Sequence, residues 1–100
     1  MSTIAKKYSG LQREVFALYR RALRMAHSKP ATTRPNFTTF VRYTFRTRAA
    51  SVSPRNVSAI EHMLRTGRRQ VAALEDEAVR DCFVSNEMLR WETERRQARG

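Results

Sequence analysis

The stretch "LQREVFALYRRALRM", residues 11–25, decides the fold, because its apolar side chains recur at helical spacing. They are separated by alternating steps of four and three residues, at Leu11, Val15, Leu18, Ala22 and Met25. Such steps place side chains on one face of an α-helix. The arginines of the stretch fall largely on its other faces. The pattern therefore predicts an amphipathic helix that buries one face in a core and exposes a cationic face.

The boundaries of this helix are indicated by its flanking residues. "SGLQ", residues 9–12, has the form of a capping box, in which a serine and a glutamine satisfy free backbone N–H groups. We therefore expect residues 1–8 to form a loose N-terminal arm. Pro30, in the polar stretch "HSKPATTRPN", should end the helix.

Two further helices are predicted downstream. Asn36 is a good N-cap for a helix running to about Ala50, whose apolar residues are Phe37, Phe40, Val41 and Phe45. Its threonine content would also suit a β-strand, but the spacing of these residues favours a helix. Ser53 and Pro54 predict the start of the third helix, which carries an apolar stripe at Val57, Ile60, Leu64, Gly67, Val71, Leu74 and Ala78.

A glycine within that stripe costs about 1 kcal/mol relative to alanine, so Gly67 indicates a close approach of another backbone or of a partner. A simple packing glycine is an equally good interpretation.

After the third helix, Val84, Met88 and Trp91 have helical spacing, so residues 81–100 form either a fourth short helix or a mobile tail of mixed charge. We predict an all-α, up-down three-helix bundle over residues 9–80, with an arm at 1–8 and an extension at 81–100.

The charge of the chain is strongly positive and unevenly distributed. Twenty Lys and Arg residues against nine Asp and Glu residues give a net charge of +11. Residues 1–50 hold 11 of the cations and a single acid, Glu14, for a net charge of +10. Such a field attracts anions, whether nucleic acid, anionic lipid or an acidic protein surface. No apolar run approaches the ~18 residues of a transmembrane helix, so stable membrane insertion is not expected.

The N-terminal composition, rich in Lys, Arg, Ser and Thr, also suits mitochondrial import. The charged run continues into the predicted bundle, so we expect an uncleaved internal signal. The single cysteine, Cys82, cannot form an intramolecular disulfide, which fits a reducing compartment.

Residues that would support catalysis or metal binding are missing from the sequence. The two histidines, His27 and His62, lie 35 positions apart, and with one cysteine they match no zinc spacing. Three scattered glycines cannot form a phosphate-binding loop. The sequence therefore predicts a protein that is not an enzyme and holds no metal or cofactor.

Two arginine clusters are the candidate binding surfaces. The first, Arg20, Arg21 and Arg24, lies on the first predicted helix, and the second, Arg65, Arg68 and Arg69, surrounds Gly67. Arginine suits bidentate contacts to carboxylates or phosphates. Because few acids lie nearby in sequence, partner binding is favoured over a merely solvated surface. Nucleic acid or ribosome binding stays open as an alternative, although no recognition-helix or RNA-binding signature accompanies the charge.

These residues resemble a known family. "SGLQREVFALYRRALRMAHSKP", residues 9–30, is similar to the opening of the LYR-motif proteins, small basic three-helix proteins of the mitochondrial matrix. Phe45 stands where the family keeps a phenylalanine. "SPRNVSAIEHMLRTGRRQV", residues 53–71, resembles the branch that assists assembly of succinate dehydrogenase. The likeness covers about residues 9–74.

The resemblance implies an assembly chaperone of the mitochondrial matrix. Its client would be the iron–sulfur subunit of succinate dehydrogenase (complex II), protected during cluster insertion and gripped by Arg65, Gly67, Arg68 and Arg69. The element Leu18, Tyr19 and Arg20, with Phe45, would contact an iron–sulfur transfer co-chaperone, and Arg21 and Arg24 would add basic surface. Acyl carrier protein, which docks on other LYR proteins, is left open as a partner. Within the family, a complex I accessory subunit is the alternative.

Overall fold

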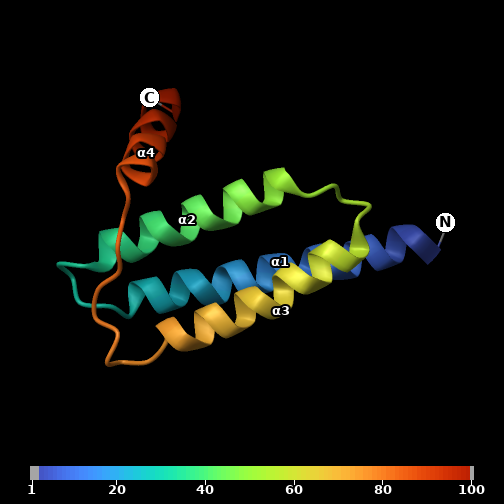
Figure 1. The fold of residues 1–100 in the computed structure, drawn as a ribbon, viewed down its shortest axis with the longest axis horizontal. Helices are drawn as coiled ribbons and strands as arrows, with labels where there is room; N and C mark the ends of the chain where they lie inside the picture. Colours follow the sequence, from blue (N-terminus) through green and yellow to red (C-terminus); the bar gives the residue numbers. More distant parts are fainter. Residues whose placement is uncertain (1–2, 100) are drawn as a thin grey trace.

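The computed structural model describes residues 3–99, with the side chains of residues 10–99, and this part of the chain is entirely helical (Figure 1). The four helices are α1 (Thr3–His27), α2 (Arg34–Ser51), α3 (Val57–Leu74) and α4 (Asn86–Arg99). The all-α class is therefore confirmed for residues 3–99, which contain no strand, and α2 is a helix rather than the rival strand.

The helix α1 begins earlier than the sequence indicated. The backbone is helical from Thr3 onward, so most of the predicted arm lies within the helix and no capping box opens it at Ser9. Ala5, Lys6 and Lys7 are good helix formers, and no proline interrupts the run, which explains why the helix continues. Residues 1 and 2 of the predicted arm lie outside the described part of the chain.

The helix α2 begins at Arg34, two residues before the predicted cap Asn36. Pro35 lies in the first turn, where its missing N–H leaves no helical hydrogen bond unmade. The N-cap residue Thr33 makes no capping bond, and its hydroxyl donates instead to the Arg80 carbonyl at 2.6 Å. Asn36 donates to the Asp81 carboxylate at 3.0 Å. Both polar residues therefore bind the segment that precedes α4.

The helix α3 is shorter than predicted at both ends. Ser53 and Pro54 do not open it, because the Ser53 hydroxyl accepts from the Arg55 backbone in a separate turn. Asn56 is the cap, and its side chain accepts from the Ala59 N–H at 3.1 Å. At the other end the helix stops at Leu74 rather than near Ala78.

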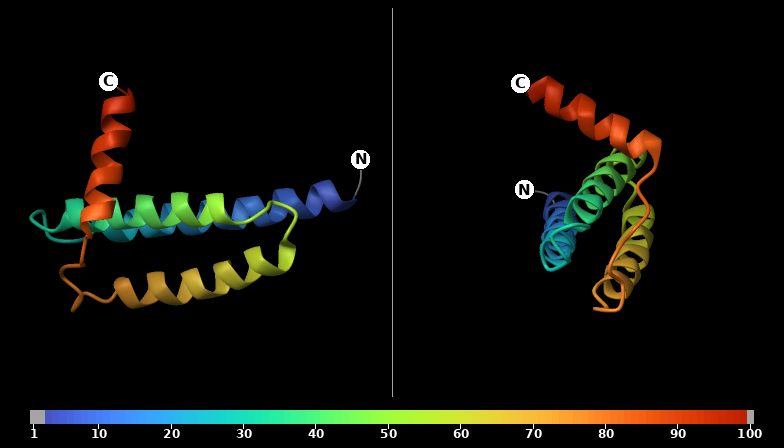
Figure 2. Two further views of the ribbon diagram at one scale, coloured as in Figure 1. Left: turned by 45° about the horizontal axis from the view of Figure 1, so that its top comes forward. Right: turned by 90° about the vertical axis from the view of Figure 1, so that its left-hand side faces the viewer.

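The extension beyond α3 contains the helix that the sequence offered as one of two alternatives. Its start is capped by Ser85, whose hydroxyl accepts from the Met88 N–H at 3.1 Å. The helix α4 packs against α2 and projects away from the other helices (Figure 2).

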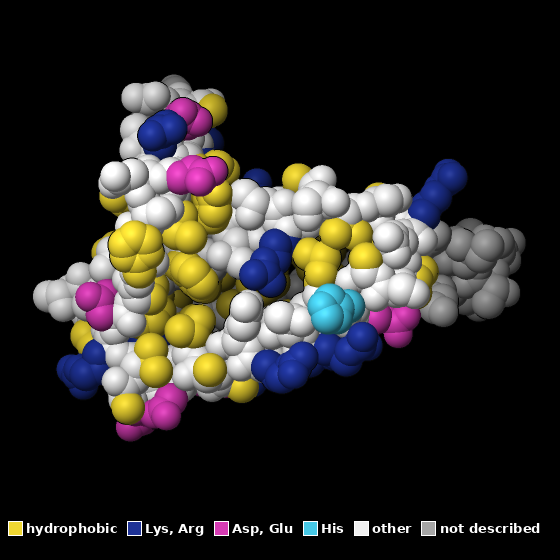
Figure 3. All heavy atoms as spheres, viewed as in Figure 1, with side chains coloured by type: hydrophobic (Ala, Val, Ile, Leu, Met, Phe, Trp, Pro, Cys, Tyr) yellow, Lys and Arg dark blue, Asp and Glu magenta, His cyan; other side chains and the backbone are white. Residues whose placement is uncertain are grey.

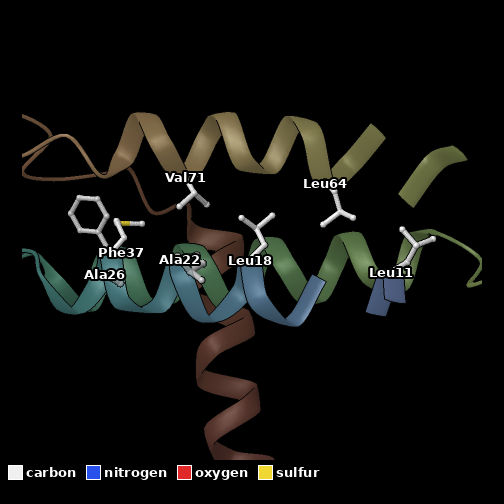
Figure 4. Close-up of a cluster of buried hydrophobic side chains, with 9 residues drawn as sticks. Leu11, Leu18, Ala22, Ala26, Phe37, Leu64 and Val71 are labelled. Atoms are coloured by element: carbon white, nitrogen blue, oxygen red, sulfur yellow. The ribbon is translucent and has the colours of Figure 1, made fainter. Parts of the chain in front are cut away.

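The first three helices alternate in direction, and α1 is the element that joins them (Figures 1 and 2). It packs against both α2 and α3, whereas no Cα atom of α2 lies within 8 Å of one in α3. The buried core follows α1, as Figure 4 shows. It comprises Leu11, Leu18, Ala22, Met25, Ala26, Phe37, Val41, Leu64 and Val71. The bundle is therefore closed along α1 and open between α2 and α3.

Candidate protein-binding surfaces

The Leu18–Tyr19–Arg20 tripeptide does not form a single patch. Successive residues of an α-helix point about 100° apart, and each of the three side chains has a different environment. Leu18 is buried against α3, Tyr19 is half-buried against α2, and Arg20 is exposed. The tripeptide thus anchors α1 through its first two residues and offers only the third to a partner.

Phe45 lies against the tyrosine of the tripeptide. The ring centroids of Tyr19 and Phe45 are 5.0 Å apart with the rings tilted at 60°, a favourable aromatic geometry. The structure therefore brings these two predicted contact residues together at the α1–α2 interface. Most of the Tyr19 ring is engaged in this packing, so a partner could reach mainly its outer edge.

Two of the six clustered arginines are held by acids of the chain itself. Arg21 donates to Glu75 through two nitrogens, at 2.9 and 2.7 Å. This bond holds the pKa of the Glu75 carboxyl below its ordinary value, with smaller effects of the Arg21 and Arg24 charges. Arg68 lies 3.7 Å from the Glu14 carboxylate. The first pair joins α1 to the C-cap residue of α3, and the second joins α1 to α3 itself. Arg21 and Arg68 therefore have acidic partners that are distant in sequence, although few acids lie near them along the chain.

The remaining four arginines are free for a partner. Arg20, Arg24, Arg65 and Arg69 are exposed and form no ion pair within residues 10–99. Figure 3 shows a row of Lys and Arg side chains along the outer edge of α3. Arg65 and Arg69 are one helical turn apart and therefore share a side of α3. They form the free part of the predicted client-binding cluster.

Gly67 lies at the contact between α1 and α3. A Cβ atom at this position would lie 2.9 Å from the Leu18 Cδ2 atom, closer than side chains normally approach. The glycine therefore lets the two helices approach closely, which explains its place on the apolar stripe. Of the predicted client-binding residues, it is the one that faces the interior of the bundle.

An apolar cavity of about 390 Å³ lies between the first three helices. It is lined mainly by hydrophobic side chains, including Val15, Phe40, Phe45, Met63 and Leu64, and Arg48 is its charged lining residue. Figure 3 shows hydrophobic side chains in a hollow between α2 and α3. A volume of this size falls in the range of small-ligand sites.

The sequence did not predict this cavity. Helical spacing predicts which side chains face the interior, but not whether the side chains of different helices contact one another there. The one available signal was the small, β-branched Thr44 on α2. It lines the cavity where a larger hydrophobic residue would help to fill it.

Two buried charges were also missed. Lys29 is 4% exposed, and its ammonium group donates to the carbonyls of Asp76 and Val79 at 3.1 and 2.6 Å. It also lies 5.1 Å from the centroid of the Phe37 ring. The lysine thus joins the end of α1 to the segment after α3. Its partners lie about fifty residues away, so no local pattern could identify them.

The second buried charge is Glu92 on α4, which is 7% exposed. Arg95 donates to it at 3.1 and 2.9 Å, Arg96 donates at 3.3 Å, and Arg42 of α2 lies 3.7 Å away. The bond from Arg95 is the main reason that the pKa of Glu92 lies below its ordinary value. The spacing of Glu92, Arg95 and Arg96 was a local signal, although the contact with α2 was not.

Other kinds of site find little support in the described residues. Within residues 3–99, no group of three or more His, Cys, Asp or Glu residues is placed to hold a metal ion. None of the helices in this part is long and apolar enough to cross a membrane. Burial, with a contribution from Asp81, raises the pKa of the Cys82 thiol to about 11. The thiol is therefore protonated and weakly nucleophilic at neutral pH.

Exposed arginines and an apolar cavity on a small basic helical bundle are features suited to binding other molecules. Comparison with known sequences identifies the family: the profile described as Complex 1 protein (LYR family) matches residues 13–73. The chain belongs to this family. The matched region contains α2 and almost all of α3, and it ends before α4.

Curated relatives bear more specific names. Succinate dehydrogenase assembly factor 1, mitochondrial, of Saccharomyces cerevisiae is 37% identical over 67 residues, covering 67% of this chain and 84% of the relative. The protein of that name from Schizosaccharomyces pombe is 39% identical over 77 residues, covering 77% and 96%. Succinate dehydrogenase assembly factor 1A, mitochondrial, of Dictyostelium discoideum is 32% identical, covering 76% and 85%. No solved structure matches the chain significantly.

Proposed function

We propose that this protein is an assembly factor for succinate dehydrogenase in the mitochondrial matrix. It would bind the iron–sulfur subunit of that enzyme and protect it during cluster insertion. The observation that carries the proposal is the similarity to relatives named succinate dehydrogenase assembly factor 1, which extends over most of their length. The role requires binding rather than catalysis, in keeping with the surfaces described above.

Arg65 and Arg69 of α3 are the residues proposed to bind the client. They are exposed, lie one turn apart and form no ion pair within residues 10–99. Guanidinium groups in this arrangement can make bidentate, charge-assisted bonds with carboxylates on another protein. Arg68 contributes once its long contact with Glu14 is exchanged for a client carboxylate. Gly67 supports this surface by letting α3 lie close to α1.

The test compares two double charge reversals that change the net charge equally. Arg65→Glu with Arg69→Glu should abolish capture of purified iron–sulfur subunit by the full chain. Arg80→Glu with Arg90→Glu, at exposed positions that form no ion pair within residues 10–99, should leave capture intact. Circular dichroism checks that both variants are folded. Unchanged capture by the first variant, or equal loss by both, would contradict the proposal.

The Leu18–Tyr19–Arg20 element is proposed to recruit an iron–sulfur transfer co-chaperone. Leu18 and Tyr19 fix the position of α1, and the free guanidinium of Arg20 supplies the exposed contact. Arg20→Glu should then weaken co-chaperone binding and leave client binding unchanged. This result would separate the two surfaces, since Arg20 and the α3 arginines lie on different helices.

The cavity favours acyl carrier protein as an additional partner. Its apolar lining and volume of about 390 Å³ suit part of an acyl chain, and Arg48 offers a charge among the lining residues. Thr44→Phe should fill the cavity and weaken the complex with acyl-loaded carrier protein. Binding of carrier protein that lacks the acyl group serves as the control and should not change.

Nucleic acid is the alternative that the net charge of +11 raises most directly. Phosphates would satisfy the same arginines, with binding that falls steeply as salt rises. Nuclease treatment of a matrix extract before capture distinguishes binding of a protein client from binding of nucleic acid. Captured iron–sulfur subunit should persist after nuclease, and its loss would favour the nucleic-acid alternative.

A further inference from the structure

The helix α4 lies outside the residues matched by the family profile, and the function proposed above gives it no task. Among the helices it packs against α2 alone, and Figure 2 shows it projecting away from the bundle. Where the two helices cross, Trp91 packs edge-on against Tyr43, with ring centroids 5.7 Å apart. A hydrogen bond with Glu87 raises the pKa of the Tyr43 phenol. These contacts fix the side chains at the crossing of α2 and α4.

Three guanidinium groups converge on one carboxylate oxygen at this crossing. The Oε1 atom of Glu92 lies 2.9 Å from an Arg95 nitrogen and 3.3 Å from an Arg96 nitrogen. A nitrogen of Arg42, on α2, lies 3.7 Å from the same oxygen. The three side chains therefore come from both helices and surround a single negative charge.

Arg95 alone supplies the pairing that the buried carboxylate needs. A buried charge is unfavourable unless it is paired, and Glu92 is 7% exposed. Arg95 donates to both of its oxygens, at 3.1 and 2.9 Å, and is itself largely covered. Three arginines against one glutamate leave a net charge of +2 at the crossing. This excess belongs to Arg42 and Arg96.

Most of the hydrogen-bond donors of Arg42 and Arg96 are unused. A guanidinium carries five N–H donors. Arg42 donates no hydrogen bond within residues 10–99, because its distance of 3.7 Å from Glu92 is too long for one. Arg96 uses only its Nε atom there. Their side chains are 36% and 74% exposed, and both approach the same oxygen, so one small anion in solution can reach both.

The surrounding charges add to the excess rather than cancel it. Arg46 lies one turn after Arg42 on α2, and Arg99 lies one turn after Arg96 on α4. Both are exposed and form no ion pair within residues 10–99. Glu94 points roughly 160° away from Arg96 at 100° per residue. An anion at the crossing would therefore meet a positive field.

We propose that Arg42 and Arg96 bind a dianionic phosphate group at the crossing of α2 and α4, either free phosphate or the headgroup of phosphatidic acid. A terminal phosphate group carries a charge of about −1.5 to −2 at neutral pH and has three acceptor oxygens. Its charge matches the net charge of +2, and its oxygens match the fork of a guanidinium group. Glu92 and Arg95 keep their own pair, so the phosphate binds without displacing the buried carboxylate.

Charge distinguishes this ligand from a nucleic-acid backbone and from an acidic peptide. Each backbone phosphate of a nucleic acid carries a single negative charge, as does each carboxylate. Either group would leave part of the excess uncompensated. Sequence-tolerant binding of single strands also uses aromatic faces on which bases stack. Here the Trp91 ring is engaged by Tyr43 and lies beside Arg95.

The experiment titrates the full chain with inorganic phosphate at neutral pH and constant ionic strength, followed by NMR of backbone amides and arginine Nε–H groups. Wild type should show saturable shifts confined to the crossing of α2 and α4. Arg96→Gln and Arg42→Gln should each raise the Kd about tenfold or more, since each removes charge-assisted hydrogen bonds. Arg90→Gln is the matched control, an exposed arginine that lies six residues before Arg96 and roughly 120° around α4. Its Kd should stay within about twofold of wild type.

Two vesicle preparations distinguish the sources of the phosphate group. Phosphatidylcholine vesicles that contain phosphatidic acid should bind wild type and lose the Arg96→Gln variant if the source is a lipid headgroup. If free phosphate binds and these vesicles bind no better than phosphatidylcholine alone, the source is a soluble phosphate. Both results support the site, because both depend on the same two arginines.

Other outcomes would overturn the proposal. These are the absence of saturation in wild type, equal losses for Arg90→Gln and Arg96→Gln, and binding of acetate as tight as that of phosphate. Displacement of phosphate by an oligonucleotide at an equal concentration of phosphate groups would favour a nucleic-acid surface instead. Arg96→Gln leaves the bond between Arg95 and Glu92 in place, so α4 should stay attached to α2. The fluorescence of Trp91, the single tryptophan of the chain, checks this attachment.

Discussion

The contact between α1 and α3 and the gap between α2 and α3 lie in the same bundle but are built differently. Along the first, Gly67 lets Leu18 reach the α3 backbone, and two ion pairs bridge the helices. Between α2 and α3, by contrast, no Cα atom of one helix lies within 8 Å of a Cα atom of the other. An apolar cavity of about 390 Å³ remains there. The fold is thus held by one side of the bundle, and the other side leaves room for a ligand or partner.

The difference also separates residues that the sequence had grouped together. Leu18 and Gly67 were assigned to binding sites, and both lie in the closed contact. Arg65 and Arg69 surround the same glycine but point away from that contact and form no ion pair within residues 10–99. A variant at the first pair therefore tests folding, and a variant at the second pair tests binding.

The largest effect is expected for Leu18→Ala. Leu18 is 7% exposed and contacts α3 at Gly67, so its truncation leaves a void in the closed contact. The free energy of unfolding should fall by about 2–5 kcal/mol, measured by urea denaturation. A loss below about 1 kcal/mol would mean that the site collapses readily, and the contact would then not be the one that holds the fold.

Helical spacing was sufficient to predict α1, α2 and most of α3, because each buries a continuous stripe whose period is local. The start of α3 was misplaced because two good caps, Ser53 and Asn56, lie three residues apart, and only packing decides between them. The roles of Lys29 and Thr33 could not be predicted, because their carbonyl partners lie almost fifty residues away. The cavity could not be predicted either, because its lining residues come from three helices that are far apart in sequence.

The second prediction compares one substitution on the two sides of the bundle. Gly67→Leu inserts a side chain where even a Cβ atom would lie 2.9 Å from Leu18, and it should destabilise the fold by about 1–3 kcal/mol. Thr44→Leu adds apolar volume to the cavity and should be neutral or stabilising. Urea denaturation of both variants measures the contrast.

Gly67→Ala is the informative control for this pair. Alanine has a higher helix propensity than glycine, which should stabilise the variant by about 1 kcal/mol. This gain is opposed by the close contact of the new Cβ atom with Leu18, which is relieved in part because the end of the Leu18 side chain can shift slightly. The net effect on unfolding should therefore be small. Equal losses for Gly67→Leu and Thr44→Leu would contradict the distinction between a closed and an open side.

The third prediction concerns pH and the attachment of α4. The bond from Arg95, with that from Arg96, lowers the pKa of Glu92 in the folded protein relative to about 4.3 in an unfolded chain. The unfolded chain therefore takes up the proton first as the pH falls. The stabilisation is complete above the unfolded pKa and is lost as the pH falls through the folded pKa.

Glu92→Gln should accordingly be less stable than wild type at neutral pH, and the difference should shrink below about pH 4.3. The effect should be smaller than that of Leu18→Ala, because α4 packs against α2 alone among the helices. The measurement is the free energy of unfolding of both proteins between pH 7 and pH 2. Repulsion among the cations grows in both proteins as the pH falls, so it cancels when one free energy is subtracted from the other. A difference that does not depend on pH would show that the carboxylate contributes by shape rather than by charge.

The smallest effects are expected for the two ion pairs that bridge the closed contact. Arg21→Ala removes two short bonds to Glu75, and Arg68→Ala removes a longer contact with Glu14, but all four side chains are well exposed to solvent. Exposed pairs contribute little and are screened by salt. Both variants should therefore unfold close to wild type, with Arg21→Ala the more affected and its deficit shrinking as salt is raised. If either loss approached that of Leu18→Ala, the closed side would be held by charge, and the division between packing residues and binding arginines would have to be redrawn.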